Sequence, residues 1–550
     1  MSFDGESRLQ DDAAAGAIEG DPSAGLAQCE DRLLPGQPLR RLSSAQYANT
    51  IRDLFGEQLA RPLLQDTVFP ATRIDRGFVN DAEANVVNTA ESNAIEDNAE
   101  RVAGVILADP DAYVTGLLPC ELSSGYADAD VDGCMDDFIA EFGTRAYRRP
   151  LTEGETQILR GLYDQLREDN TAVESLSSVV QLLVQAPALL YRVERGADEA
   201  LPGLVRLGDY EMASRLSYFF LDSMPDDALF AEAAGGRLST PAEVEQQARR
   251  LMESSHFASV LDNHHRDWLH LHELDRMTKD PQLHPDFNDE VRAALMQEAS
   301  RFVRHVIEEG DGSVRSLLSS STVPLNSVLA DYYGVSAQGA DIDSWVPTEV
   351  ESRRGLFTLA SFQGSQAGVD RTDPIHRGLF YQEEVLCNDL PPFPGNVDTQ
   401  SVLRDTSMLP TARQRLSPLM DNAPCNGCHT LFNPTGLAFE NFDAAGQWRD
   451  QEGGTEIDSS GTVELDGEQH AFDGPLEMAA LVADSAQARD CYSLQWFRDA
   501  LGRHEFAEDA CSIALVEQVA ADTDGSIEAL LIAITQTDAF LYRAVTEVEP

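Results

Sequence analysis

The sequence predicts a mainly α-helical protein that is divided into several domains. Its 550 residues are too many for one hydrophobic core, and its apolar content of 42% is ordinary for a chain that folds. Apolar residues recur at helical spacing along most of the chain, whereas strand-like alternation is confined to one short stretch. We therefore expect packed helices joined by linkers, with a minor strand component.

The expected helices begin at recognisable capping sequences. Ser43 and Gln46 form the first capping box, and Gly56 marks the end of that helix. The apolar residues between them fall on one helical face: Tyr47, Ile51, Leu54 and Phe55. Further starts are predicted at Thr152 with Glu155, at Asp209 and near Ser223, and helical spacing continues through residues 241–310 and 350–362.

One region departs from helical spacing. In residues 456–473, apolar residues alternate with polar ones among several glycines and aspartates, a pattern typical of one small β-hairpin.

Breaks rich in proline, glycine and aspartate indicate linkers at 107–133, 195–205, 335–350 and 390–394. These features predict the following division: an acidic disordered tail over 1–37, an N-terminal helical domain over 38–106, a helical domain over 134–196, a central helical domain over 205–335, a domain over 350–450, and a C-terminal helical domain with the hairpin over 455–548.

Acidic residues dominate the charge of the chain. It has 94 acidic and 40 basic residues, which gives a formal net charge of −54, and Lys279 is its only lysine. Such a surface repels nucleic acid and anionic membranes, so we expect neither as a partner. The acidic residues are spread along the whole chain, which favours adaptation to high salt over a local face that steers a basic partner, although both interpretations stay open.

No stretch predicts a transmembrane helix. The most apolar segment, residues 179–191, is too short to span a bilayer and is interrupted by two glutamines and a proline. Residues 1–20 carry acidic residues where a signal peptide has a basic start and an apolar run. Export, if other features require it, therefore implies that a leader is missing from this sequence.

One motif carries specific chemistry, the CxxCH pattern Cys425-Asn-Gly-Cys428-His429. In this pattern the two thiols bond covalently to the vinyl groups of haem, and the histidine reaches the iron as its fifth ligand. A redox dithiol usually opens a helix in a βαβ unit, and a zinc site needs further ligands nearby; neither context is evident. We therefore expect one covalently bound haem c, with a plain Cys425–Cys428 disulfide as a further alternative.

The residues around the motif resemble those of a family of large secreted proteins of planctomycete and myxobacterial type. The segment from Cys425 to Arg449 is similar to the cytochrome-c-like region of that family. Further similarities follow the family's domain order at residues 41–56, 142–152, 210–227, 354–387, 457–461 and 500–503. The resemblance implies a mostly helical, exported haem protein with a C-terminal cytochrome-c-like region, and it implies no known reaction.

Two positions depart from the family pattern. Phe432-Asn433 stands before Pro434, where the family commonly has methionine and aspartate. Met420 stands where a histidine is common. If either position contacts the haem, the haem pocket of this protein differs from that of the family.

The sixth iron ligand is not determined by the sequence. Met478 lies at a plausible distance downstream, but it shares a helix face with Leu476 and Leu481, which favours a role in the core. The weaker candidates are His376, Met420, His470 and His504. A methionine ligand would favour electron transfer, whereas an open position would permit a haem oxidoreductase.

The remaining six cysteines permit three disulfides. Short loops favour Cys120–Cys134 and Cys491–Cys511, which leaves Cys29 for Cys387; six free thiols are the alternative. Oxidised pairs would support a location outside the cytoplasm.

Two weaker patterns suggest metal sites. The first pattern is a group of six histidines within residues 256–284: His256, His264, His265, His270, His272 and His284. We favour packed or solvated side chains there over a metal site. Residues 128–133 begin like a calcium-binding loop, but Ile139 occupies the position of the required glutamate, so we take the match as coincidence.

Taken together, the sequence leads us to expect a periplasmic or cell-surface monohaem c-type protein. We expect it to transfer electrons to a redox partner, which the acidic surface would suit if that partner is basic. In this hypothesis Cys425 and Cys428 anchor the haem, His429 binds the iron, and residues 433–449 wrap the haem edge. The alternatives are a haem oxidoreductase with an open sixth position and a haem-free extracellular binding protein.

Overall fold

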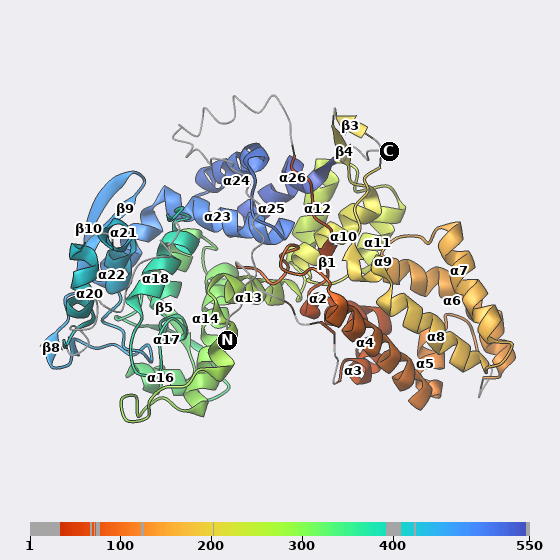
Figure 1. Cartoon of the computed structure of the whole chain (residues 1–550), viewed down its shortest axis with the longest axis horizontal. Coiled ribbons are helices and arrows are strands. Elements are labelled where there is room, and N and C mark those ends of the chain that lie inside the picture. The colour runs from red at the N-terminus through yellow and green to blue at the C-terminus, as the bar shows by residue number, and fades with distance from the viewer. Residues whose placement is uncertain are drawn as a thin grey trace, which may run out of the picture.

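The computed structural model of the chain describes residues 34–545, except 66–68, 71, 73–76, 123–125, 198, 202, 392–408 and 423–424. The predicted acidic tail therefore lies almost entirely outside the described residues. Two large hydrophobic cores divide most of the rest into an N-terminal lobe, mainly residues 40–192, and a C-terminal lobe, mainly residues 199–545. Phe78 packs in the core of the C-terminal lobe, and Tyr218 and Met224 pack in that of the N-terminal lobe. Figure 1 shows the helices of the N-terminal lobe gathered at one end of the molecule.

The N-terminal lobe is a bundle of helices closed by a short pair of strands. Its elements are β1 (Arg40–Arg41), α2 (Ser44–Phe55), α3 (Glu57–Leu64), α4 (Thr89–Ala108), α5 (Pro110–Leu117), α6 (Asp128–Tyr147), α7 (Glu153–Leu166), α8 (Ala172–Gln185), α9 (Pro187–Leu190) and β2 (Tyr191–Arg192). Helix α8 packs against α4, α6 and α7, so its apolar residues form the centre of this core. Strands β1 and β2 are antiparallel, with Arg40 opposite Arg192, and join the first element of the lobe to its last.

The helix starts agree with the predicted capping sequences. At α2 the Ser43 side chain accepts the Gln46 N–H, and the Gln46 side chain accepts the Ser43 N–H. The same reciprocal pair joins Thr152 and Glu155 at the start of α7. Each box satisfies two backbone N–H groups that a helix start otherwise leaves without partners.

The C-terminal lobe begins with four α-helices and continues through shorter elements. Its first part comprises β3 (Glu199–Leu201), β4 (Leu204–Arg206), α10 (Asp209–Phe220), α11 (Asp227–Ala234), α12 (Pro241–Met252), α13 (Phe257–Trp268), the 3₁₀-helix η1 (Leu271–Arg276), α14 (Asp289–Arg304), the π-helix η2 (His305–Glu309), α15 (Val314–Ser319), β5 (Thr322–Leu325), α16 (Ser327–Tyr333) and β6 (Val346–Glu349). Helices α10 and α11 confirm the starts predicted at Asp209 and near Ser223.

The second part of this lobe carries the CxxCH motif and the C-terminal helices. It comprises η3 (Leu356–Thr358), α17 (Ala360–Ser365), α18 (Pro374–Phe380), the π-helix η4 (Tyr381–Val385), α20 (Ala412–Asp421), α21 (Asn426–Leu437), β7 (Gln451–Glu452), β8 (Thr455–Glu456), β9 (Ser460–Leu465), β10 (Glu468–Asp473), α22 (Pro475–Asp484), α23 (Ala486–Leu501), η5 (Ala507–Asp509), α24 (Ala510–Asp522), α25 (Ile527–Gln536), α26 (Asp538–Leu541) and β11 (Tyr542–Ala544). The C-terminal strand β11 pairs with β4, which returns the chain to the start of the lobe.

The strand content is as small as predicted. Every sheet of the described residues has two or three strands. The predicted hairpin is confirmed by β9 and β10, which pair Val463 with His470 and bury Val463, Leu465 and Phe472 on one face.

Three predicted linkers contain regular structure instead, and the one over 335–350 includes β6. Residues 107–133 include α5 and the first turns of α6, because Asp109 caps a helix that has Pro110 at its first position. Residues 195–205 supply β3 and most of β4. The segment that begins like a calcium-binding loop, Asp128–Gly133, is the start of α6 and therefore does not form such a loop.

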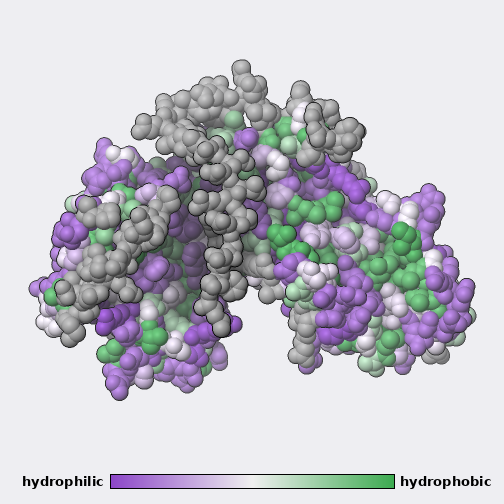
Figure 2. Space-filling view, in the orientation of Figure 1, coloured by the Kyte–Doolittle hydropathy of each residue, from purple (hydrophilic) through white to green (hydrophobic). Residues whose placement is uncertain are grey.

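Polar residues cover much of the molecule. Figure 2 shows hydrophilic residues spread over both lobes on the visible face, interrupted by smaller apolar areas. In the part of the chain that the structure describes, no helix combines the length and apolar character needed to cross a membrane.

Candidate functional site

The CxxCH motif occupies the first turn of α21. Cys425 precedes the helix, and its carbonyl accepts the N–H groups of Cys428 and His429 at 3.3 and 3.1 Å. Positions i, i+3 and i+4 of a helix lie on one face. The helix therefore brings both thiols and the imidazole to the same side, which is the arrangement that attachment of one planar group requires.

Cys425 and Cys428 both remain free thiols. Cys425 is buried, at 7% exposure, and packs in a small core with Leu416, Leu419 and Leu437, whereas Cys428 is half-buried. The alternative in which these two cysteines form a structural disulfide is therefore not observed.

The imidazole of His429 is oriented by a residue one turn further along the helix. Its Nδ1 lies 3.1 Å from Oδ1 of Asn433, a fully buried side chain. With Oδ1 as the acceptor, Nδ1 carries the proton, and Nε2 keeps its lone pair for a metal. No described residue bonds to His429 Nε2, and the buried Nδ2 of Asn433 also has no partner. Two free thiols and this imidazole fit covalent attachment of haem.

Helix α21 is held against α18 at a backbone-to-backbone contact. A Cβ atom at Gly436 would lie 1.8 Å from the Pro374 carbonyl oxygen, and one at Gly378 would lie 2.1 Å from the Phe432 carbonyl oxygen. The buried Arg377 donates to the Gly436 carbonyl at 2.8 and 3.1 Å and forms an ion pair with the buried Glu440. These contacts fix the helix that presents the motif.

The segment after the motif enters the large core. Ala438, Phe439 and Phe442 are completely buried there, and Arg449 pairs with Glu440. These aromatic side chains anchor α21 in the lobe, and the expectation that residues 433–449 wrap the edge of a haem stays a prediction.

The candidate sixth ligands lie on different elements. Met478 is fully buried on α22 within the large core. His376 is exposed on α18, with Nδ1 2.6 Å from Asp373 Oδ2, and Met420 is half-buried on α20. Both α18 and α20 pack against α21, so these two residues are on the helices nearest the motif. His470 lies on β10, and His504 follows α23.

Of the three predicted disulfides, Cys120–Cys134 is present, and Cys491–Cys511 and Cys29–Cys387 are wrong. Cys120 and Cys134 are joined, as predicted from their short separation. Cys387 is joined to Cys491 rather than to Cys29, because η4 packs onto α23 and brings these two cysteines together. Cys511, which we had paired with Cys491, is also disulfide-bonded, and Cys29 lies outside the described residues.

The histidine group does not form a metal site within the described residues. His264 stacks on Trp496 with ring centroids 3.4 Å apart and bonds through Nδ1 to Asp499, and His265 bonds to the Tyr492 hydroxyl. Both rings are packed side chains of α13, as we favoured. Burial raises the pKa of Asp499 to about 7, and burial together with Asp499 raises the pKa of Asp222 to about 7.

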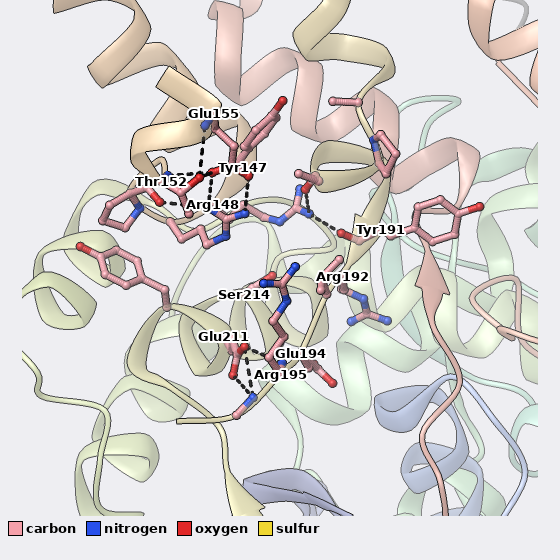
Figure 3. A pocket seen from close by; sticks show the side chains of 18 residues that line it. Tyr147, Arg148, Thr152, Glu155, Tyr191, Arg192, Glu194, Arg195, Glu211 and Ser214 are labelled. Carbon is pink, nitrogen blue, oxygen red and sulfur yellow. Dashed lines mark hydrogen bonds and ion pairs between the residues drawn. The ribbon is translucent and has the colours of Figure 1, made fainter. Parts of the chain in front are cut away.

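A second feature lies apart from α21, where the two lobes meet. A cavity of about 610 Å³ is bounded by the end of α6, the start of α7, the segment from α9 to Gly196, and α10. Figure 3 shows Arg148 and Glu155 on the α6–α7 side, with Arg195, Glu211 and Ser214 on the α10 side. Four arginines line this cavity, in a chain where acidic residues outnumber basic ones by more than two to one.

Reasoning from the sequence missed two groups of residues. Asn433 was noted only as a departure from a family pattern, although its i+4 spacing from His429 could have indicated the contact. The arginine-lined cavity joins residues from two predicted domains, and no local pattern marks it.

Five domain models match consecutive segments of the chain. Each is described as a protein of unknown function: DUF1587 at 40–108, DUF1595 at 134–194, DUF1592 at 207–335, DUF1588 at 353–452 and DUF1585 at 468–540. The CxxCH motif lies within the DUF1588 match, whose short name is PSCyt3. No curated protein and no solved structure shows a significant match to the chain. The chain thus consists largely of five consecutive domains of unknown function from a cytochrome-c-associated family.

Proposed function

We propose that this protein is an exported monohaem c-type cytochrome that transfers electrons. The observation that carries the proposal is the first turn of α21, which puts two free thiols and an imidazole with an unengaged Nε2 on one face. When bound, a haem supplies a one-electron redox centre. Cys425 and Cys428 would hold it covalently, and His429 would bind the iron.

The protein's own residues would set the conditions of electron transfer. Asn433 keeps the His429 proton on Nδ1, and the α18–α21 contact keeps the helix in one orientation. Disulfides Cys120–Cys134 and Cys387–Cys491 support a location in an oxidising compartment. A net charge of −54 would steer a basic redox partner toward the protein.

The test is a pyridine haemochrome spectrum of the full chain, exported in a host with a haem-attachment system. We expect a c-type spectrum and a haem that stays with the denatured protein. The Cys425→Ala/Cys428→Ala variant should lose the covalent haem, whereas His256→Ala, at an exposed histidine before α13, should keep it. A wild-type protein without covalent haem would exclude the proposal.

Carbon monoxide separates electron transfer from haem catalysis. We expect no rapid binding of carbon monoxide to the reduced protein, because an electron-transfer haem has a protein ligand on each side. Rapid binding would indicate an open sixth position and favour the oxidoreductase alternative. If carbon monoxide does not bind rapidly, His376→Ala, Met420→Ala and Met478→Leu identify the sixth ligand, because the variant that lacks it should bind carbon monoxide rapidly.

A further inference from the structure

The arginine-lined cavity at the junction of the two lobes has more positive than negative charge. Arg148, Arg149, Arg192 and Arg195 line it together with three carboxylates. The surrounding protein is strongly acidic, so this local excess is unusual for the molecule. The ligand that would suit the cavity can be inferred from which of these charges are already paired.

All three carboxylates are engaged by other groups. Glu155 accepts two bonds from Arg149, at 2.9 and 2.8 Å. Glu194 pairs with Arg40 and Arg215; burial alone would raise the pKa of Glu194, but these arginines lower it to about 2. Glu211 accepts the backbone N–H groups that precede α10. None of the three carboxylates forms an ion pair with Arg148, Arg192 or Arg195.

Three arginines of the cavity form no ion pair with a described carboxylate. Arg148 donates only to neutral acceptors, the carbonyls of residues 188, 189 and 191 and the Tyr218 hydroxyl. Arg192 is 5% exposed, and its Nε and one terminal nitrogen have no hydrogen-bond partner. Arg195 is exposed, and no described carboxylate pairs with its guanidinium. Burial lowers the pKa of Arg192; the nearby Glu194 opposes this shift, whereas the charges of Arg215 and Arg148 add to it.

An uncharged donor lies in the same cavity. The hydroxyl of Ser214, a residue only 8% exposed, has no hydrogen-bond partner. Figure 3 shows it beside Arg195 on the α10 side of the cavity. A buried polar group without a partner costs free energy, so its presence beside unpaired guanidinium groups points to a ligand that accepts hydrogen bonds.

We propose that this cavity binds a small organic oxyanion, a molecule that carries a carboxylate, phosphate or sulfate group. Guanidinium groups bind such oxygens through paired N–H donors. A volume of about 610 Å³ is in the range of small-molecule sites and exceeds what a bare ion fills. The proposal does not rest on the haem, because the cavity lies at the junction of the two lobes and its lining includes no residue of α21.

The experiment is a thermal-shift titration of the full chain with citrate, glucose 6-phosphate and glucose 6-sulfate, at an ionic strength held constant with sodium chloride. We expect a saturable rise in melting temperature with at least one probe, and the tightest probe identifies the anionic group. Arg195→Gln should weaken that binding about tenfold or more, since it removes a charged hydrogen-bond donor. Ser214→Ala should weaken it less, because it removes a neutral donor.

The matched control is Arg276→Gln, which removes the same charge from an exposed arginine outside the cavity. It should bind the probe as the wild type does. The proposal is overturned if no probe gives a saturable shift, or if Arg195→Gln and Ser214→Ala both bind like the wild type. A loss of affinity that Arg276→Gln shares would also contradict it, because general electrostatics would then explain the binding.

Discussion

At the residue scale, Asn433 is the side chain that most directly controls the candidate haem ligand. Its Oδ1 lies 3.1 Å from His429 Nδ1 and is a neutral acceptor. Partners of this kind orient a ligating histidine and tune the electron density that it gives to the metal. The identity of residue 433 should therefore affect the potential of the haem.

The first prediction is that Asn433→Asp lowers the reduction potential of the haem-loaded protein. A carboxylate accepts the Nδ1 proton more strongly than an amide does and so stabilises the ferric state. A difference of about 1 kcal/mol corresponds to roughly 40 mV for one electron. Potentiometric titration measures the change. Asn422→Asp adds the same charge at an exposed residue before the motif and should shift the potential much less; equal shifts would mean that charge alone is responsible.

The second prediction concerns Asp222. Burial, with a contribution from Asp499, raises its pKa to about 7 in the folded protein, well above the value near 4 in an unfolded chain. Between pH 4 and 7 Asp222 is therefore protonated in the folded state and ionised in the unfolded state. The free energy of unfolding consequently falls as the pH rises through that window. Asp222→Asn should reduce this loss, measured as the difference in urea midpoint between pH 5 and pH 8. The same pH dependence in both proteins would refute the assignment.

At the element scale, the crossing of α18 and α21 is the contact that places the motif. The helices meet through glycines because any side chain would collide with a backbone carbonyl. The third prediction is that Gly436→Ala destabilises the protein by about 2 kcal/mol or more, since a rigid backbone opposes the new Cβ. Urea denaturation measures it.

A control for this substitution lies on the same helix. Gly427 is in the first turn of α21, and a Cβ atom there would meet nothing within 4 Å. Gly427→Ala should leave stability unchanged or raise it by up to about 1 kcal/mol, because alanine favours a helix over glycine. Equal losses in the two variants would show that the α18–α21 contact is not the cause.

The fourth prediction concerns the disulfide between the end of η4 and α23. Cys387 and Cys491 are 104 residues apart, whereas Cys120 and Cys134 are 14 apart. In the chain-entropy account, loops of these sizes contribute about 4.7 and about 3 kcal/mol. Replacing Cys387 and Cys491 with alanine should therefore destabilise the protein more than replacing Cys120 and Cys134. Recovery of a Cys491–Cys511 peptide from a non-reducing digest would contradict the observed pairing directly.

At the scale of the whole molecule, the acidic surface should make stability depend on salt. A net charge of −54 creates self-repulsion that opposes the compact state, and salt screens it. The fifth prediction is that the melting temperature rises between about 0.05 and 1 M sodium chloride, a range in which the Debye length falls well below 10 Å. Calorimetry measures it, and a flat or falling melting temperature would contradict salt adaptation.

The two candidate sites share no lining residue. The CxxCH helix belongs to the C-terminal lobe, and the arginine-lined cavity lies where α10 meets the end of the N-terminal lobe. Binding at the cavity can therefore be measured in the same full chain whether or not haem is attached.

The sequence by itself determined the features that depend on neighbours along the chain. Capping boxes at Ser43 and Thr152, the hairpin around Val463 and the helical spacing of apolar residues are local, because each satisfies backbone groups within a few residues. The CxxCH motif is local as well, since one helical turn is enough to align its three side chains.

Tertiary structure alone decided the features that depend on which elements pack together. Loop length suggested Cys511 as the partner of Cys491, but packing of η4 on α23 brought Cys387 there instead. The arginine-lined cavity likewise joins residues from α6 to α10, and its charge depends on which carboxylates the fold has already paired. A disulfide or a binding cavity requires close approach in space, and separation along the chain does not specify that approach.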